Sequence, residues 1–433
     1  MAVGAGVAYR VTSAEDRKRF YAAALDVLRE LRAAAAKPRP EYDQFRAALR
    51  GRMRYALVTP AIGLVMTLIF ARRVLDAGAI DPDTLVAWGA SLGTRTTNGE
   101  WWRLVTSAFL HDSLLHLLVD IVALIQAGLI LERLVGRLTV AAVYVLGGVF
   151  AGLFYVSSQP LAVTLGTTSA VFGLYGLLLA LMMWQTFHRW RGREVNEHDV
   201  IIPPIAMKRL AVGAALFLVY SGFTGRIHAA ELTGLLVGAI YGVVFARRSV
   251  ERQPRQAFVA GATLAALALA AGGAIRIGTI TDVKPELAQV LAVEETTAAA
   301  YQAQLEALKN GRIGPEALAA LTEETIVFKL QAAGDRLKSL ENVPAEHQPA
   351  LADAREYVRL RCASWRARGN AIRRAYAERP RRPEGADDTS WRLQLQARFR
   401  SDEAARANAE GAERASREAL QRVVTFLKTA EHS

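Results

Sequence analysis

Cysteine is almost absent from this sequence of 433 residues. Its single cysteine, Cys362, excludes an intramolecular disulfide, and one thiol alone does not indicate a redox compartment. The sequence also lacks an apolar segment near its start. Residues 1–50 are charged and rich in alanine, so we expect no signal peptide there. No internal repeat is visible either.

Apolar residues make up 52% of the chain and are concentrated between Tyr55 and Ile275. The formal net charge is +12, and a basic protein of this kind could bind nucleic acid. Here, however, much of the basic charge flanks apolar runs, which is typical of residues that orient a protein in a membrane. We therefore expect a lipid bilayer as the partner and no nucleic acid.

Seven apolar runs are candidates for membrane-spanning helices, although some are shorter than the ~20 residues of an average span. Seven spans place the two ends of the chain on opposite sides of the membrane. The predicted fold class is therefore all-α, a polytopic helical bundle. The predicted spans are Tyr55–Ala71, Leu114–Leu131, Thr139–Ser157, Thr168–Trp184, Leu210–Phe223, Ile227–Phe245 and Ala257–Ile275.

Loop charges predict the orientation of these spans. Arginines and lysines precede the first span and fill the loops after the second, fourth and sixth, whereas the loop 158–167 has no charge. The positive-inside rule then places the N-terminus in the cytoplasm and the segment after the seventh span outside. We expect an integral protein of a bacterial inner membrane.

The segments outside the spans differ in composition. Residues 1–54 are predicted to form amphipathic helices, either a cytoplasmic extension or a membrane-surface segment. The long first loop, 72–113, carries three tryptophans and is expected to form short interfacial helices. Residues 283–433 are rich in Ala, Glu, Arg and Gln, with breaks that predict about four helices. The predicted domains are 1–54, a core at 55–245, a basic loop with the seventh span at 246–282, and a soluble helical domain at 283–433.

Three stretches carry the chemistry. Gly166–Gly173 reads Gly-Thr-Thr-Ser-Ala-Val-Phe-Gly and opens the fourth span, where hydroxyl side chains are ordinary helix caps. Trp102-Arg103 is followed by His111, His116 and Asp120, and the sixth span begins His-Ala-Ala-Glu-Leu-Thr-Gly. Together, in this order, the three stretches resemble the signature of the rhomboid intramembrane serine proteases. The matching structural positions are Trp102, Arg103, His111, Gly166, Gly173, Gly234 and Gly238.

The resemblance implies a six-span core with a serine nucleophile at the start of the fourth span and a histidine base on the sixth. A histidine and an asparagine on the second span complete the oxyanion hole in this family. The unpaired N–H groups of a helix N-terminus favour a developing oxyanion. Glycines at a four-residue spacing allow two membrane helices to approach closely.

The sequence departs from the family at the positions that do the chemistry. Thr168 stands at the serine position, with Ser169 at the following glycine. Glu231 stands at the position of the histidine base, and Asp120 replaces the asparagine, so that of these only His116 remains. A carboxylate near a developing oxyanion repels it, where asparagine would donate a hydrogen bond. Because one residue turns a helix by about 100°, we expect Ser169 to face away from the sixth span.

Three hypotheses follow. The first is a catalytically inactive member that binds the transmembrane helices of client proteins, while its C-terminal domain contacts a protein partner. The second is an active serine-type intramembrane endopeptidase, in which His228 serves Thr168 or Ser169 as a shifted base.

The third hypothesis is an intramembrane metal or proton site. His116 and Asp120 share one helix face, and His228 and Glu231 share another, which together form a ligand set suited to zinc. The alternative to a metal is a satisfied polar cluster, with Glu231 hydrogen-bonded to His116 or Thr168. On this basis no cofactor is expected.

Overall fold

The computed structural model describes residues 40–77, 81–191, 200–223, 229–251, 253–376 and 387–431. Most of the predicted N-terminal extension lies outside these residues. Within them the regular elements are all helices, with one isolated bridge between Ser91 and Thr164. The chain divides into two compact units. The first comprises residues 1–89, 104–154 and 165–270, and the second comprises 90–103, 155–164 and 271–433.

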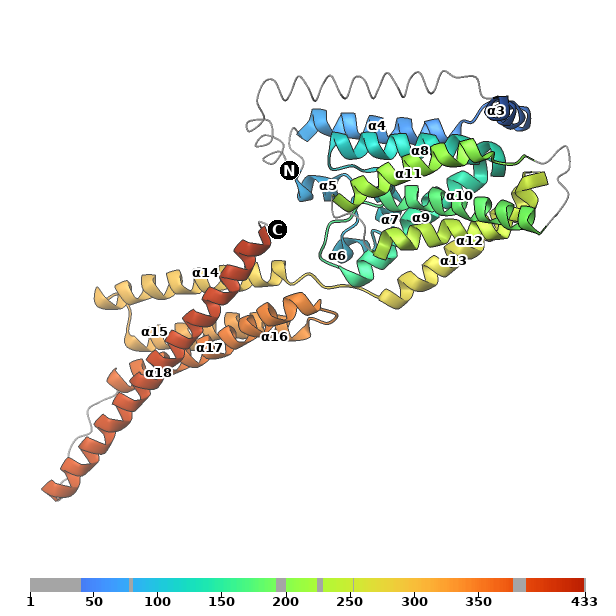
Figure 1. The fold of residues 1–433 in the computed structure, drawn as a ribbon. Helices are drawn as coiled ribbons and strands as arrows, with labels where there is room; N and C mark the ends of the chain where they lie inside the picture. Colours follow the sequence, from blue (N-terminus) through green and yellow to red (C-terminus); the bar gives the residue numbers. More distant parts are fainter. Residues whose placement is uncertain are drawn as a thin grey trace, which may run out of the picture. The chain divides into compact units, whose positions relative to one another are not determined.

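The first unit is a bundle of apolar helices (Figure 1). Among the described residues, six helices are long and apolar enough to cross a membrane, and the apolar part of a seventh, Ala229–Phe245 in α12, is shorter. The predicted all-α polytopic bundle is therefore confirmed. The seven helices are α4 (Val58–Ala77), α8 (Leu114–Val135), α9 (Arg137–Ser158), α10 (Thr167–Trp190), α11 (Pro204–Phe223), α12 (Ala229–Glu251) and α13 (Gln256–Ile277).

Each helix corresponds to one predicted run, with shifted ends. At α11 the shift is at the start, which is Pro204 and not Leu210. Proline is favoured in the first turn of a helix because its missing N–H would be unpaired there anyway. Lys208 and Arg209 therefore belong to the helix and not to the preceding loop. The predicted short helices of the first loop are α5 (Pro82–Ala87), α6 (Gly93–Thr96), α7 (Arg103–Thr106) and the 3₁₀ turn η1 (Ser107–Phe109).

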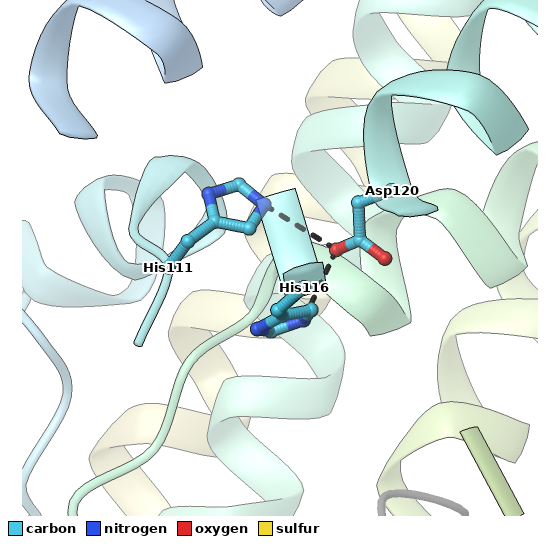
Figure 2. A group of neighbouring side chains, drawn as sticks. All are labelled: His111, His116 and Asp120. Carbon is cyan, nitrogen blue, oxygen red and sulfur yellow. Dashed lines mark ion pairs between the residues drawn. The ribbon is translucent and has the colours of Figure 1, made fainter. Parts of the chain in front are cut away.

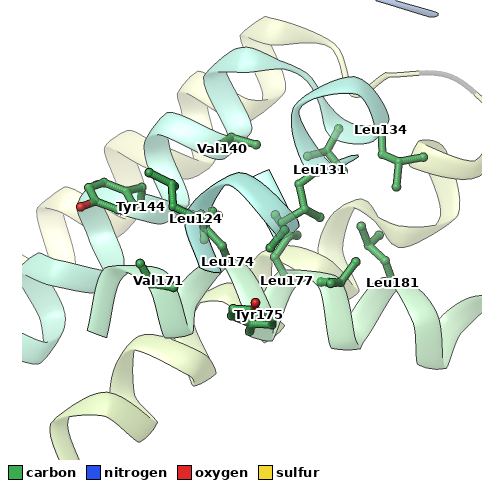
Figure 3. Close-up of a cluster of buried hydrophobic side chains, with 14 of the residues drawn as sticks. Leu124, Leu131, Leu134, Val140, Tyr144, Val171, Leu174, Tyr175, Leu177 and Leu181 are labelled. Atoms are coloured by element: carbon green, nitrogen blue, oxygen red, sulfur yellow. The ribbon is translucent and has the colours of Figure 1, made fainter. Parts of the chain in front are cut away.

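The core of the first unit lies between α8, α9 and α10 (Figure 3). Leu124 and Leu131 of α8 pack with Val140 and Tyr144 of α9 and with the leucines of α10. The hydroxyl of Tyr144 donates to the carbonyl of Ala108 at 2.5 Å, which satisfies its polar end inside the bundle. Many leucines and valines on the outward faces are exposed, as expected for helices whose solvent is lipid. The amphipathic helix α3 (Pro40–Arg52) buries Phe45 and Leu49 in the same core.

Glu132, near the end of α8, holds the start of α4. Its fully buried carboxylate accepts the backbone N–H groups of Leu57, Val58 and Thr59 at 2.6 to 2.9 Å, and the Thr59 hydroxyl at 2.8 Å. These N–H groups would otherwise be the unpaired donors of a helix N-terminus. Directly after α8 ends at Val135, Gly136 adopts a φ of +92°, which favours glycine and allows the tight turn into α9.

We predict that Glu132→Ala lowers the free energy of unfolding by an amount on the order of 3 kcal/mol, because it leaves several buried donors unpaired. Thermal unfolding of the full chain in detergent measures the change. Glu306→Ala is the matched control, since Glu306 forms an exposed pair with Lys309 that contributes little. Equal melting of the two variants would contradict the anchoring role of Glu132.

Among its described residues after position 283, the second unit contains four helical segments, at the places that the sequence breaks predict. They are α14 (Lys284–Lys309); α15 (Pro315–Ala320), continued by a π-helical turn (Leu321–Val327) and α16 (Phe328–Ser339); the 3₁₀ turn η3 (Ala345–His347) with α17 (Gln348–Tyr376); and α18 (Asp388–Glu431). Glu294 accepts the Tyr357 hydroxyl at 2.6 Å and pairs with Arg361 in the interior. Thr97 and Asn98 hydrogen-bond Ile280, which ties part of the first loop to the start of the C-terminal segment.

Candidate functional site

The first part of the site is the N-terminal turn of α8. The Ser113 side chain caps this helix by accepting the N–H of His116 at 3.2 Å. His116 and Asp120 follow one turn apart and both point into the bundle, whereas Leu115 and Val122 on the other face are exposed. This alternation is the ordinary amphipathic pattern with its polar stripe turned inward, as in a membrane helix that carries a functional site.

The second part is the N-terminal turn of α10. Thr167, Thr168 and Ser169 are all buried, and Thr168 is only 4% exposed. The first N–H groups of a helix have no partner within that helix and carry the positive end of its dipole. The turn could therefore stabilise negative charge, as the sequence predicts for this position.

The third part is the start of α12, which approaches α10 closely. A Cβ atom placed on Gly234 would lie 2.2 Å from the carbonyl oxygen of Ser169, and one on Gly238 would lie 1.7 Å from that of Gly173. No side chain fits at such distances, so these glycines allow the backbones to touch. Glu231, one turn before Gly234, is thereby brought to the start of α10, where it is 3% exposed.

Two of these side chains, His116 and Asp120, form a compact polar cluster with His111 of the preceding loop (Figure 2). Oδ2 of Asp120 lies 3.2 Å from Nε2 of His116 and 3.4 Å from Nε2 of His111. On its other side, Nδ1 of His116 lies 3.0 Å from Asp112 Oδ1. Nε2 of the same ring lies 2.9 Å from the hydroxyl of Thr168. His116 is therefore the centre of the site.

The structure corrects the expected partners of the α10 hydroxyls. The prediction that Ser169 faces away from the sixth span is wrong, because its hydroxyl donates to Glu231 Oε1 at 3.5 Å. Thr168 pairs with His116 of α8 instead. The reason is that α10 passes between the two helices, so adjacent residues in its first turn reach opposite neighbours. Nothing local in the sequence indicates which hydroxyl meets which helix.

The candidate metal ligands also group differently from the expectation. His111, His116 and Asp120 are the described residues whose ligand atoms all lie within 4.8 Å of one another. His228, the proposed shifted base and a proposed ligand, lies outside the described residues. His111 was expected only as a motif position. Its location just before the Ser113 cap, five residues from His116, is the sequence signal that places both rings at the same end of α8.

Comparison with known proteins identifies the domain that carries this site. Residues 98–248 match the family model of the rhomboid domain. The chain contains a rhomboid domain. Because the matched residues contain α8 to α12, the polar cluster and the α10–α12 contact both lie within the rhomboid domain.

Individual relatives include proteins named as proteases and one named as inactive. Rhomboid protease AarA of Providencia stuartii is 24% identical over 216 residues, 46% of this chain and 77% of the relative. Rhomboid protease GluP of Bacillus subtilis is 33% identical over 132 residues, 30% of this chain and 25% of the relative. Inactive RHOMBOID-like protein 8 of Arabidopsis thaliana is 35% identical over 94 residues, 22% of this chain and 27% of the relative. The matches with the last two span about a quarter of those relatives' lengths.

The Trp-Arg pair of the rhomboid domain is well ordered by its contacts. The guanidinium of Arg103 donates to Glu100 at 2.5 Å and to the carbonyl of Ala90 at 3.1 Å, and it lies 4.6 Å from the centre of the Trp102 ring. Arg103 is almost fully buried, whereas Trp102 is half exposed. The pair therefore fixes the fold of the first loop and leaves an aromatic face available to the membrane interface.

Proposed function

We propose that this rhomboid-family membrane protein does not use the family's proteolytic mechanism and instead binds transmembrane helices of client proteins. The observation that carries the proposal is the contact of Glu231 with Ser169. At the position of the family's histidine base the structure has a carboxylate, and this carboxylate meets the residue after Thr168. A threonine nucleophile needs a base within hydrogen-bond reach, and the carboxylate does not supply the imidazole that shuttles the proton.

Asp120 supports the same conclusion. Its carboxylate is completely buried and lies beside His116, at the position where the family places an oxyanion-stabilising asparagine. Amide donors stabilise the negative charge of a tetrahedral intermediate, whereas a carboxylate opposes it. The histidine base and the oxyanion-hole asparagine of the family mechanism are therefore both replaced by carboxylates, Glu231 and Asp120.

The surface of α11 is the proposed client-binding face. This helix buries few side chains, and Val212, Leu218 and Val219 expose about half of their surface or more. A helix so lightly attached to the bundle offers apolar side chains against which a second membrane helix packs by van der Waals contact. The C-terminal helical unit is proposed to bind a protein partner of its own.

Site-specific photocrosslinking in native membranes tests this function. A photoreactive residue at Val219 should capture a defined membrane protein, identified by mass spectrometry, whereas one at Leu269 of α13, which is more exposed than Val219, should capture lipid only. Identical capture patterns from the two positions would contradict a specific client face on α11.

A second candidate function is hydrolysis by a different set of residues. Asp112, His116 and Thr168 lie in series, with 3.0 Å between carboxylate and Nδ1 and 2.9 Å between Nε2 and hydroxyl. This is the order in which an orienting acid, a base and a nucleophile act in a catalytic triad. Against it, Nε2 also faces Asp120 at 3.2 Å. If Nε2 carries a hydrogen for that carboxylate, it cannot take the proton of Thr168.

Single substitutions distinguish the active schemes. If the protein cleaves a membrane substrate, loss of cleavage in His116→Ala and Asp112→Asn favours the series through His116. Loss in His228→Ala, with His116→Ala still active, favours the shifted base that the sequence suggests. Absence of cleavage in the parent protein excludes both and supports the client-binding function.

We also propose that the C-terminal unit lies outside the cytoplasm and the N-terminus inside. The basic loops support this orientation. The hydrogen bonds between Thr97, Asn98 and Ile280 support it as well, since they require the first loop and the start of the C-terminal unit to be on the same side.

We predict that alkaline phosphatase fused after Ser433 is active and that green fluorescent protein fused there is dark, in a bacterial host. The same reporters fused after Arg191, in a basic loop, should give the opposite result. A fluorescent fusion at Ser433 would contradict both the orientation and the count of seven spans.

A further inference from the structure

Two of the three side chains of Figure 2, His111 and Asp120, are buried without the hydrogen bonds that buried polar groups normally make. His111 and Asp120 are 1% and 0% exposed. Both ring nitrogens of His111 and both carboxylate oxygens of Asp120 have no hydrogen-bond partner among the described residues. Buried polar atoms are paired in the great majority of proteins, and a buried carboxylate without a partner is especially costly. The cluster therefore requires an explanation.

The hydrogen-bond donors and acceptors around His116 limit the possible explanations of this cluster. An ionised Asp112 can only accept, so Nδ1 of His116 carries the hydrogen of their 3.0 Å bond. In the neutral ring Nε2 is then a lone pair. It can accept the Thr168 hydroxyl at 2.9 Å, and it also faces Oδ2 of Asp120 at 3.2 Å. Two acceptors at this distance repel each other unless a cation lies between them. The cation is either an additional proton or a metal ion.

The alignment of the groups favours the metal ion. A proton on Nε2 of either ring would form a directed hydrogen bond to Asp120, yet these contacts of 3.2 and 3.4 Å do not have hydrogen-bond geometry. In a tetrahedral zinc site with bonds of about 2.0 Å, neighbouring donor atoms lie about 3.3 Å apart. The distances from Oδ2 to the two imidazole nitrogens match that separation, and all three ligand atoms lie within 4.8 Å of one another.

We propose that His111, His116 and Asp120 bind a zinc ion in the core of the rhomboid domain. Two imidazoles and one carboxylate are a frequent zinc ligand set, whereas calcium and magnesium prefer oxygen ligands. The ion neutralises the buried charge of Asp120 and joins the loop before α8 to the first turns of that helix. The hydroxyl of Thr168, 2.9 Å from Nε2 of His116, lies beside the fourth coordination position.

The environment of His116 supports the assignment independently. A histidine that binds zinc usually donates its other ring N–H to a carboxylate, which fixes the tautomer and orients the ring. Asp112 provides this contact, one helical turn before His116. The sequence thus holds both a ligand set and the outer carboxylate that such a set requires. The site is independent of the proposed client binding, because it makes no use of the α11 surface.

Metal analysis of the purified full-length protein tests the proposal. The protein is prepared with a tag that contains no histidine, and its metals are measured by plasma mass spectrometry. We expect about one zinc per chain, reduced more than tenfold in His111→Ala and in Asp120→Asn. Asp120→Asn changes no volume and introduces the residue found in the family, so it should fold. The matched control is His347→Ala, because His347 is also a buried histidine but lies in the second unit.

A second measurement uses the parent protein alone. After removal of metal by a chelator, addition of Co²⁺ should produce the visible absorption bands of a tetrahedral cobalt site, and addition of Zn²⁺ should remove them. Zinc that persists in both ligand variants would overturn the proposal. So would a folded parent protein without stoichiometric metal and without cobalt bands, which would show that the cluster holds an extra proton instead. Stoichiometric iron in place of zinc would overturn the identity of the ion.

Discussion

Purified parent protein should produce no detectable cleavage of a standard rhomboid substrate in proteoliposomes, and a serine-reactive fluorophosphonate should label neither Thr168 nor Ser169. Loss of one oxyanion-hole donor typically lowers the rate by 10²–10³, and loss of the base lowers it further. Here Asp120 stands in place of the oxyanion-hole asparagine, and Glu231 stands in place of the histidine base. Although such losses are not additive, their combination leaves no measurable activity by the family mechanism.

The control for this experiment restores the family residues. A variant with Thr168→Ser, Ser169→Gly, Glu231→His and Asp120→Asn should still insert into membranes, because the glycines that join α10 and α12 are unchanged. Extraction of this variant from membranes and its thermal unfolding verify that the fold tolerates the four substitutions. Cleavage by the parent protein that is lost in Thr168→Val would contradict the client-binding proposal and establish Thr168 as a nucleophile.

Gly238→Leu should prevent normal accumulation of the protein in the membrane. A Cβ atom at this position would lie 1.7 Å from the backbone oxygen of Gly173 and 2.6 Å from its carbonyl carbon. Overpacking of a core commonly costs about 1–3 kcal/mol when side chains can move aside. Here the obstacle is backbone, so α10 and α12 must separate, and we expect a cost at or above the upper end of that range.

Gly261→Leu on α13 is the matched control, because a Cβ atom at Gly261 meets no atom within 4 Å. The same substitution in another apolar helix should leave the yield and the melting temperature close to those of the parent. Membrane yield by immunoblot and thermal unfolding in detergent compare the two variants. If Gly238→Leu accumulates and melts like Gly261→Leu, then α12 does not contact α10 as the structure shows, and the placement of Glu231 beside Ser169 fails with it.

Much of the fold follows from local features of the sequence. Runs of apolar residues with the length of a membrane span form helices because every backbone polar group must be paired within the hydrocarbon. The breaks at 310–315 and 342–344 end the C-terminal helices where the pattern predicts. The glycines of α12, spaced every four residues, indicate a close helix contact, and their partner is α10, which begins in the stretch Gly166–Gly173.

The pairing inside the site was not predictable in this way. Sequence alignment with the family associates Glu231 with Thr168, but in the structure Glu231 meets Ser169, and Thr168 meets His116 across 52 positions of sequence. Which hydroxyl faces which helix depends on the rotation of α10 about its axis, and that rotation is set by the backbone contact at Gly234 and Gly238.

The contact of His111 with Asp120 also depends on tertiary structure. The sequence itself determined that His116 and Asp120 share one face of α8, because their spacing is one helical turn. His111 precedes the helix, and only the folding of the loop brings its ring to Asp120. Local spacing thus determines the position of a side chain on its own helix, whereas contacts between elements depend on the packing of the whole bundle.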